Sequence, residues 1–81
     1  MSQEEELVDA VRGRDHWRLD DHAAWYAPPG SRAHVRIQPV AQPTRRSRFA
    51  AAIVRDATAE HVLPCATATE AVRWAERVRL D

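Results

Sequence analysis

The run FAAAIV at residues 49–54 constrains the fold more than any other stretch, because it is the longest apolar run in the chain. In a strand, successive side chains face opposite sides of a sheet, so this run would be apolar on both faces. Such a strand is typical of the middle of a sheet that is covered on both sides. Six residues are also far too few to cross a bilayer, which requires about 20. We therefore expect residues 49–54 to form a central strand.

The stretch AHVRIQPV at residues 33–40 predicts a second, half-buried strand. Its residues alternate between an apolar set and a polar set that would face opposite sides of the sheet: Ala33, Val35 and Ile37 against His34, Arg36 and Gln38. Pro39 has no N–H group, so it ends the pairing or places the strand at an edge. The sequence PPGS at 28–31 predicts a hairpin turn before this strand. Residues 61–65 predict a shorter strand, in which Pro64 again indicates an edge.

Two capping boxes mark the starts of helices. Ser-Gln-Glu-Glu at residues 2–5 predicts a short helix over residues 3–12, which Gly13 would end. Thr-Ala-Thr-Glu at 67–70 opens the amphipathic stretch TEAVRWAERVRL, whose apolar face includes Trp74 and would pack on the sheet.

The stretch at residues 14–27 has no clear period. Trp17 and Leu19 alternate as in a strand, whereas Trp17, Asp21 and Ala24 are spaced as in a helix, so periodicity leaves both assignments open. The region carries Trp17, Trp25 and Tyr26, and we expect it to cover the second face of the sheet.

These patterns together predict one domain over residues 1–81 of the α+β class. It would hold a three- or four-stranded antiparallel sheet with a short N-terminal helix and a C-terminal amphipathic helix.

Charge is unevenly distributed along a chain whose net charge is zero. Residues 1–30 hold seven acids and three arginines, residues 31–55 hold six arginines and no acid, and residues 56–81 hold five acids and three arginines. Such asymmetry indicates either a basic surface that binds a partner or a basic middle that the acidic flanks neutralise internally. All twelve basic residues are arginine, as is typical of proteins from high-GC bacterial genomes, so arginine richness alone does not indicate nucleic-acid binding.

The compartment is predicted from two features. The start MSQEEELVD is acidic where a secretory signal would be basic and then apolar. Cys65 is the only cysteine, so no disulfide can form within one chain. We therefore expect a cytoplasmic protein that does not bind membranes.

The candidate binding site is a basic hairpin formed by Arg36, Arg45, Arg46 and Arg48. Trp25 and Tyr26 are candidate aromatic anchors, because exposed aromatic side chains often mark interfaces. These residues predict a non-enzymatic regulatory or adaptor module that binds the acidic surface of a protein partner. Self-association is a variant, in which the acidic N-terminal region of one molecule meets the basic hairpin of another. The alternative is a DNA-binding accessory domain that contacts the phosphate backbone through the same arginines.

Catalytic, cofactor and metal sites are not predicted. A polar cluster does hold residue types that ligate metals: Asp15, His16, Asp20, Asp21 and His22. Structural zinc prefers cysteine and the chain has only one, so acidic surface or capping roles are favoured for this cluster. His61 and Cys65 would lie about 13 Å apart on a regular strand, too far for a thiolate–imidazole pair. No glycine-rich phosphate loop is present.

The order of the last elements resembles two groups of nucleic-acid-binding modules. A hairpin followed by Thr67-Ala68-Thr69-Glu70-Ala71 and Trp74 is similar to the arm-binding domain of phage integrases, in which a three-stranded sheet precedes a helix. The order α-β-β-β-α is similar to that of double-stranded-RNA-binding domains. The resemblance covers roughly residues 33–80 and implies a sheet backed by a helix, with nucleic acid as the ligand.

Overall fold

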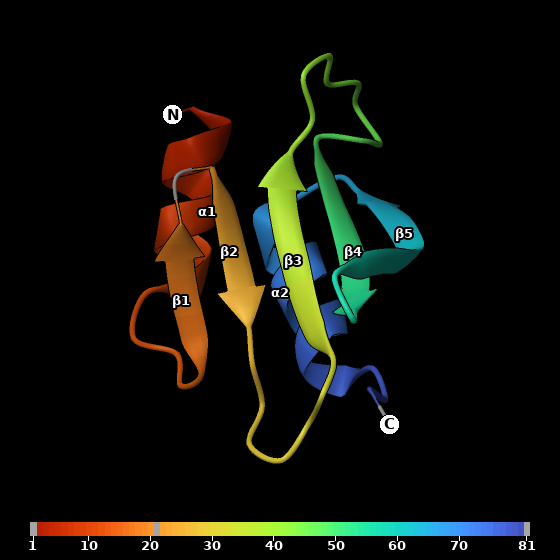
Figure 1. Cartoon of the computed structure of the whole chain (residues 1–81). Coiled ribbons are helices and arrows are strands. Elements are labelled where there is room, and N and C mark those ends of the chain that lie inside the picture. Colours follow the sequence, from red (N-terminus) through yellow and green to blue (C-terminus); the bar gives the residue numbers. More distant parts are fainter. Residues whose placement is uncertain (1, 21, 81) are drawn as a thin grey trace.

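The computed structural model describes residues 2–20 and 22–80, and within them the chain forms two helices and one sheet (Figure 1). The elements are α1 (Gln3–Val11), β1 (Trp17–Asp20), β2 (Ala23–Tyr26), β3 (His34–Pro39), β4 (Phe49–Arg55), β5 (Thr58–Cys65) and α2 (Ala68–Arg77). The α+β class and the two terminal helices are confirmed. The predicted number of strands is wrong, because the sheet has five strands rather than three or four.

The sheet is an antiparallel meander in which the strands lie in sequence order. The additional strands are β1 and β2, which come from the stretch that periodicity left open. Trp17 pairs with Tyr26, and Tyr26 pairs with Val35, so this stretch continues the pairing begun by β3. Pairing with a neighbouring strand, rather than local periodicity, decides the conformation of such short segments. Within residues 14–20, this stretch therefore forms the strand β1 and not a helix.

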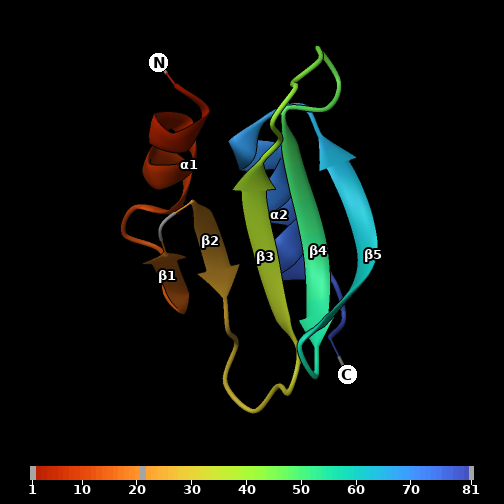
Figure 2. The same cartoon turned by 45° about the horizontal axis from the view of Figure 1, so that its top comes forward.

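Both helices cover the same face of the sheet (Figures 1 and 2). Between them lies the core, a cluster of small aliphatic side chains around one aromatic ring: Leu7, Val11, Ala24, Ala33, Val35, Ile37, Phe49, Ala51, Ile53, Cys65, Ala68, Ala71, Val72, Ala75 and Leu80. Trp74 is partly buried and packs against this cluster, as the helical periodicity predicts.

The expectation that the N-terminal region covers the second face of the sheet is wrong. That region adds two strands to the sheet, and α1 packs beside α2. The strand at 49–54 tolerates an uncovered face because the side chains on that face are small. Ala52 is only 2% exposed without a second layer, and it lies directly opposite the longer Arg36 in the register of β3 and β4.

Local hydrogen bonds define the ends of the helices. The Ser2 hydroxyl accepts from the Glu5 N–H group, and the Glu5 carboxylate accepts from the Ser2 N–H group, as the capping box predicts. The Thr67 hydroxyl accepts from the Glu70 N–H group, but the Glu70 carboxylate accepts from the Ala66 N–H group and not from that of Thr67, so only one half of the second predicted capping box is formed. In the described part of the chain, neither helix has the length and apolarity needed to cross a membrane.

Candidate binding site on the open face of the sheet

The face of the sheet opposite the helices carries two of the six candidate residues, Trp25 and Arg36. Directly paired residues of an antiparallel sheet point to the same side, so the register assigns this open face. By this register it consists of Arg18, Asp20, Ala23, Trp25, His34, Arg36, Gln38, Ala50, Ala52, Val54, Ala59 and Pro64. Ala50, Ala52 and Val54 form a flat apolar area on β4, whereas β1, β2 and β3 contribute larger polar and aromatic side chains.

Trp25 and Arg36 form the centre of the open face. They are direct cross-strand partners on β2 and β3, and the guanidinium carbon of Arg36 lies 5.9 Å from the centroid of the Trp25 ring. This distance is within the range of a cation–π contact. Both Trp25 Nε1 and Arg36 Nε are buried and have no hydrogen-bond partner among the described residues. The terminal amino groups of Arg36 are therefore the donors that remain for another molecule.

Arg45 and Arg46 lie at the tip of the β3–β4 loop, which projects beyond the end of the sheet (Figures 1 and 2). The tip is a defined turn, because the Thr44 N–H group donates to the Ser47 carbonyl and the Ser47 N–H group donates to the Thr44 hydroxyl. Both arginines are exposed, and neither forms a hydrogen bond or ion pair with the described part of the chain. The loop therefore presents two positive charges to solvent.

Arg48 lies at the base of the same loop but is engaged inside the molecule. Its guanidinium group donates to Glu6 Oε1 at 2.7 Å and to the Ala66 carbonyl at 3.2 Å, and it lies over the Phe49 ring at 5.4 Å. The other carboxylate oxygen of Glu6 accepts from the Ala68 N–H group at 2.9 Å, at the start of α2. The hydrogen bond from Arg48, followed by that from Ala68, lowers the pKa of Glu6 below its ordinary value. Arg48 thus joins α1, the loop and α2.

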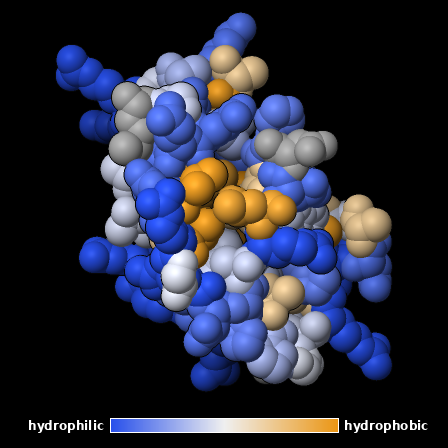
Figure 3. Space-filling view, turned by 90° about the vertical axis from the view of Figure 1, so that its left-hand side faces the viewer, coloured by the Kyte–Doolittle hydropathy of each residue, from blue (hydrophilic) through white to orange (hydrophobic). Residues whose placement is uncertain are grey.

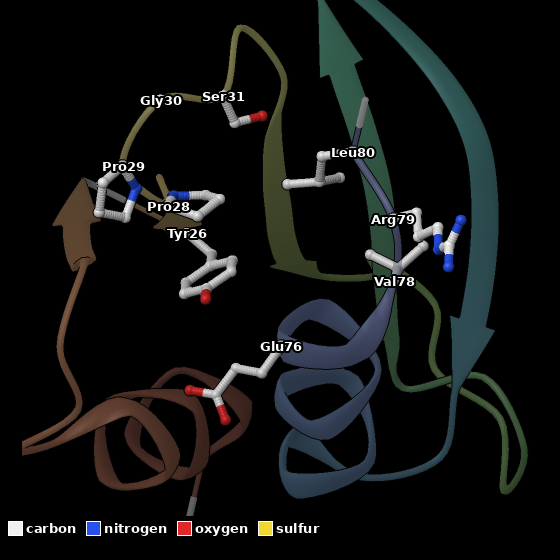
Figure 4. Close-up of a pocket in the computed structure, with 9 residues that line it drawn as sticks. All are labelled: Tyr26, Pro28, Pro29, Gly30, Ser31, Glu76, Val78, Arg79 and Leu80. Carbon is white, nitrogen blue, oxygen red and sulfur yellow. The ribbon is translucent and has the colours of Figure 1, made fainter.

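Tyr26 is placed on the helix-covered side of the sheet, away from the Arg36–Trp25 pair. Its ring stacks on Trp17 with centroids 5.0 Å apart, and Trp17 Nε1 donates to Glu76 Oε2 at 2.9 Å. The Arg14 guanidinium holds the other Glu76 oxygen at 2.7 Å. Tyr26 and Glu76 also line a groove of about 330 Å³ beside the turn at 28–31 and the C-terminal segment at 78–80 (Figure 4). The six candidate residues therefore divide among the open face, the loop tip and the helix-covered side.

Arg18 is a residue of the open face that the sequence did not single out. It pairs directly with Trp25, so Trp25 lies between two arginines in the cross-strand direction. The signal that could have identified it is the alternation in Trp17-Arg18-Leu19, but only once the stretch had been assigned as a strand.

The polar cluster near β1 does not form a metal site in the described part of the chain. His22 Nδ1 lies 3.2 Å from Glu4 Oε1, and no group of three or more His, Cys, Asp or Glu side chains in residues 2–20 and 22–80 could hold a metal ion. Asp21 lies outside the described residues. Cys65 is fully buried, and desolvation, with a smaller contribution from the charge of Glu70, raises the pKa of its thiol.

No protein-family model, curated protein or solved structure matches this chain. The resemblance to small nucleic-acid-binding modules stays a prediction.

Proposed function

We propose that this protein is a non-enzymatic binding module, regulatory or adaptor in role, whose open face binds an acidic surface of a protein partner. The observation that carries the proposal is the Arg36 guanidinium held over the Trp25 ring, with its Nε buried and without a hydrogen-bond partner among the described residues. The open face is therefore built around a positive charge that is fixed in place.

A fixed and partly desolvated guanidinium is suited to binding a carboxylate. Arginine presents donors in a planar arrangement that matches both oxygens of a carboxylate. Because the Arg36 Nε has already lost water, and because stacking on Trp25 restricts the side chain, less hydration and less conformational entropy are lost on binding. Tryptophan and arginine are also the residue types that most often dominate the affinity of protein interfaces.

The surroundings of the pair favour a protein partner. Arg18 extends the positive charge toward β1, and the loop tip adds Arg45 and Arg46 at the end of the sheet. On the other side of Arg36 lies the flat apolar area of β4. A complementary surface would combine carboxylates with apolar side chains, which is a property of proteins. Stacking platforms for single-stranded nucleic acid use several aromatic residues, whereas the open face has Trp25 alone.

Duplex DNA is the second candidate, favoured by the unpaired Arg45 and Arg46 at the loop tip. Contact of Arg36, Arg45 and Arg46 with one phosphate each would give a log–log salt dependence with a slope of roughly −2.7. Affinity would then fall roughly forty-fold between 50 and 200 mM salt. This steep dependence distinguishes backbone binding from a protein interface centred on a stacked arginine.

Titration of the ¹⁵N-labelled protein with two probes tests the proposal. One probe is a peptide in which glutamates flank a single phenylalanine, and the other is a 16-base-pair duplex of random sequence. We expect the peptide to shift the Trp25 indole and Arg36 signals in a saturable manner. Shifts restricted to residues 41–47, or stronger binding of the duplex with the steep salt dependence, would contradict the protein-binding function. No saturable shift with either probe would reject the open face as a binding site.

Matched arginine variants separate a specific site from general charge. R36A and W25A should each weaken peptide binding at least ten-fold, whereas R45A/R46A should have a smaller effect. R73A is the control, because it removes one exposed arginine from α2, outside the open face. If R73A weakens binding as much as R36A does, the peptide responds to net charge and not to the Arg36–Trp25 pair.

A further inference from the structure

The two edges of the sheet differ in how well they are protected against pairing with another strand. On β5, Pro64 has no N–H group, a register irregularity interrupts the pairing with β4 between Ala51 and Ile53, and His61 has a φ of 52°. Prolines and bulges are features by which proteins block edge pairing. β1 pairs with β2 in regular register and contains neither a proline nor a bulge. Its protection is limited to its short length of four residues and to the charges of Arg18 and Asp20, which are also features that blunt an edge. The β1 edge is therefore the one that a further strand can join.

One hydrogen bond shows which backbone groups of β1 face this edge. The Ala27 N–H group donates to the His16 carbonyl at 2.9 Å. In an antiparallel ladder, a bond between these positions makes Trp17 and Tyr26 a non-hydrogen-bonded pair. Residues of such pairs point their N–H and C=O groups away from their partner strand. Trp17 and Leu19 consequently direct these groups toward the free edge, whereas Arg18 and Asp20 use theirs with β2.

We propose that a second copy of this chain pairs with β1 in antiparallel orientation, about a two-fold axis at Leu19. In this register Leu19 exchanges two backbone hydrogen bonds with Leu19 of the partner subunit, because its N–H and C=O groups both face outward. Arg18 then lies opposite Asp20 of the partner subunit, and Asp20 lies opposite Arg18 of the partner subunit. Directly opposed side chains point to the same side, so two cross-strand ion pairs form on the open face. A carboxylate has about four acceptor sites, so Asp20 can accept Arg18 in addition to the interactions it has within its own chain.

The helix side of the same edge is apolar and exposed. Leu19 is 48% exposed and Val8 on α1 is 37% exposed, and both border one shallow groove. Leu7 and Ala23 complete its apolar lining, and Glu4, Asp20 and His22 form its polar rim. Figure 3 shows an apolar area at the centre of this side of the molecule. The two-fold axis places the Leu19 side chains of both subunits next to each other, so this apolar area is covered by its own copy. The charges of the strand, its backbone groups and the apolar side chains thus all select the same partner.

The size of the contact predicts a weak dimer. Four residues of β1 and the adjacent apolar side chains bury less than the roughly 1,200 Å² of stable interfaces, which places this pairing in the transient class. The dimer would have one continuous sheet, with both Arg36–Trp25 pairs on the same side. Its formation does not depend on the function proposed for the open face.

Sedimentation velocity between 10 µM and 1 mM protein tests the proposal. We expect the mass to rise from 9.2 kDa toward twice this value with increasing concentration. R18D places two aspartates opposite each other at both ion pairs, and D20R places two arginines there. Each variant alone should therefore stay monomeric at 1 mM. An equal mixture of R18D and D20R restores both ion pairs, so it should sediment as a dimer at least as tightly as the wild-type protein.

The mixture also controls for folding, because a variant that has lost its fold cannot regain dimerisation from a differently charged partner. The proposal is overturned if the wild-type protein is monomeric at 1 mM, or if the mixture stays monomeric. It is also overturned if R18D and D20R dimerise like the wild-type protein while R45A/R46A does not. That last result would instead support contact between acidic and basic regions of two molecules. None of these outcomes depends on whether the acidic peptide binds the open face.

Discussion

The contact between Glu6 and Arg48 leads to a sharp prediction about stability. Glu6 lies on α1, Arg48 follows the loop, and Ala68 begins α2, so one carboxylate connects three segments that are distant in sequence. The substitution E6Q keeps the size of the side chain and one acceptor oxygen, but it removes the charge. We expect E6Q to weaken the contacts to both Arg48 and Ala68.

The expected loss is about 2 kcal/mol of the free energy of unfolding. A hydrogen bond to a charged group contributes about 1.5–3 kcal/mol, and Glu6 makes two of them. The Glu6 and Arg48 side chains are 25% and 31% exposed, so solvent screens part of their interaction. We therefore expect a loss smaller than the sum of the two hydrogen-bond contributions. A chain of this length has a total stability of about 4–12 kcal/mol. A loss of about 2 kcal/mol would therefore lower the Tm by about 8–16 °C.

The pH dependence gives the prediction a second, independent readout. The pKa of Glu6 is lowered in the folded protein from its ordinary value of 4.5, so the folded state favours the ionised form. The stabilisation is complete above the unfolded pKa and is lost as the pH falls through the folded pKa. Urea unfolding from pH 7 to pH 2.5 should therefore show a constant difference between the wild-type protein and E6Q above about pH 5. The difference should shrink below pH 4.5.

The control for this experiment is E5Q. The pKa of Glu5 is also lowered, but among the described residues its carboxylate accepts a hydrogen bond only from Ser2, at the start of its own helix. E5Q should therefore have a clearly smaller effect at pH 7. If E6Q changes the stability by less than 0.5 kcal/mol, or if its effect persists unchanged at pH 2.5, the charge of Glu6 does not join the three segments as argued.

Other positions give simpler expectations, each measured by urea unfolding unless stated. A57G should stabilise the protein by about 0.5 kcal/mol, because Ala57 has a φ of 63°, which favours glycine. G30A should destabilise it by about 1 kcal/mol, because Gly30 has a φ of 77°, even though an added Cβ would meet nothing within 4 Å. Opposite signs of these two changes would contradict the argument from backbone conformation. T67A should cost about 1 kcal/mol, since it removes the acceptor for the Glu70 N–H group, and an unchanged Tm would reject the cap. Cys65, which is buried and has a raised pKa, should react with a thiol reagent only as fast as the protein opens, so a native rate equal to that in urea would contradict its burial.

The sequence predicted those parts of the fold that local contacts determine. The helix starts at Ser2 and Thr67 were recognisable because the capping hydroxyl and the N–H group that donates to it lie three positions apart. The strands β1 and β2 could not be recognised from the sequence, because each has four residues and their pattern fits a strand or a helix equally well. Pairing between Tyr26 and Val35, which are nine positions apart, settles that choice, and a single sequence contains no record of it.

The candidate site was predictable in residue type but not in arrangement. Charge counts indicated that an acidic flank could neutralise the basic middle, yet they could not identify Arg48 as the arginine that pairs with Glu6, 42 positions away. Tyr26 follows Trp25 directly, so the two rings had to point to opposite faces once the segment became a strand. The Arg36–Trp25 contact likewise depends on a register between β2 and β3 that the sequence did not reveal.

Internal neutralisation and a free basic surface are compatible in this molecule, because they concern different arginines of one loop. At its base, Gln3 Nε2 on α1 donates to the Val40 and Arg48 carbonyls, at 3.3 and 2.7 Å, and the Val40 N–H group donates to the Arg48 carbonyl. Glu6 on the same helix holds the Arg48 side chain. Both ends of the loop are thus fixed to α1, which limits the positions that Arg45 and Arg46 can occupy. The acidic helix therefore neutralises Arg48 and fixes the base of the loop that carries Arg45 and Arg46, so the paired charge belongs to the architecture of the proposed binding surface.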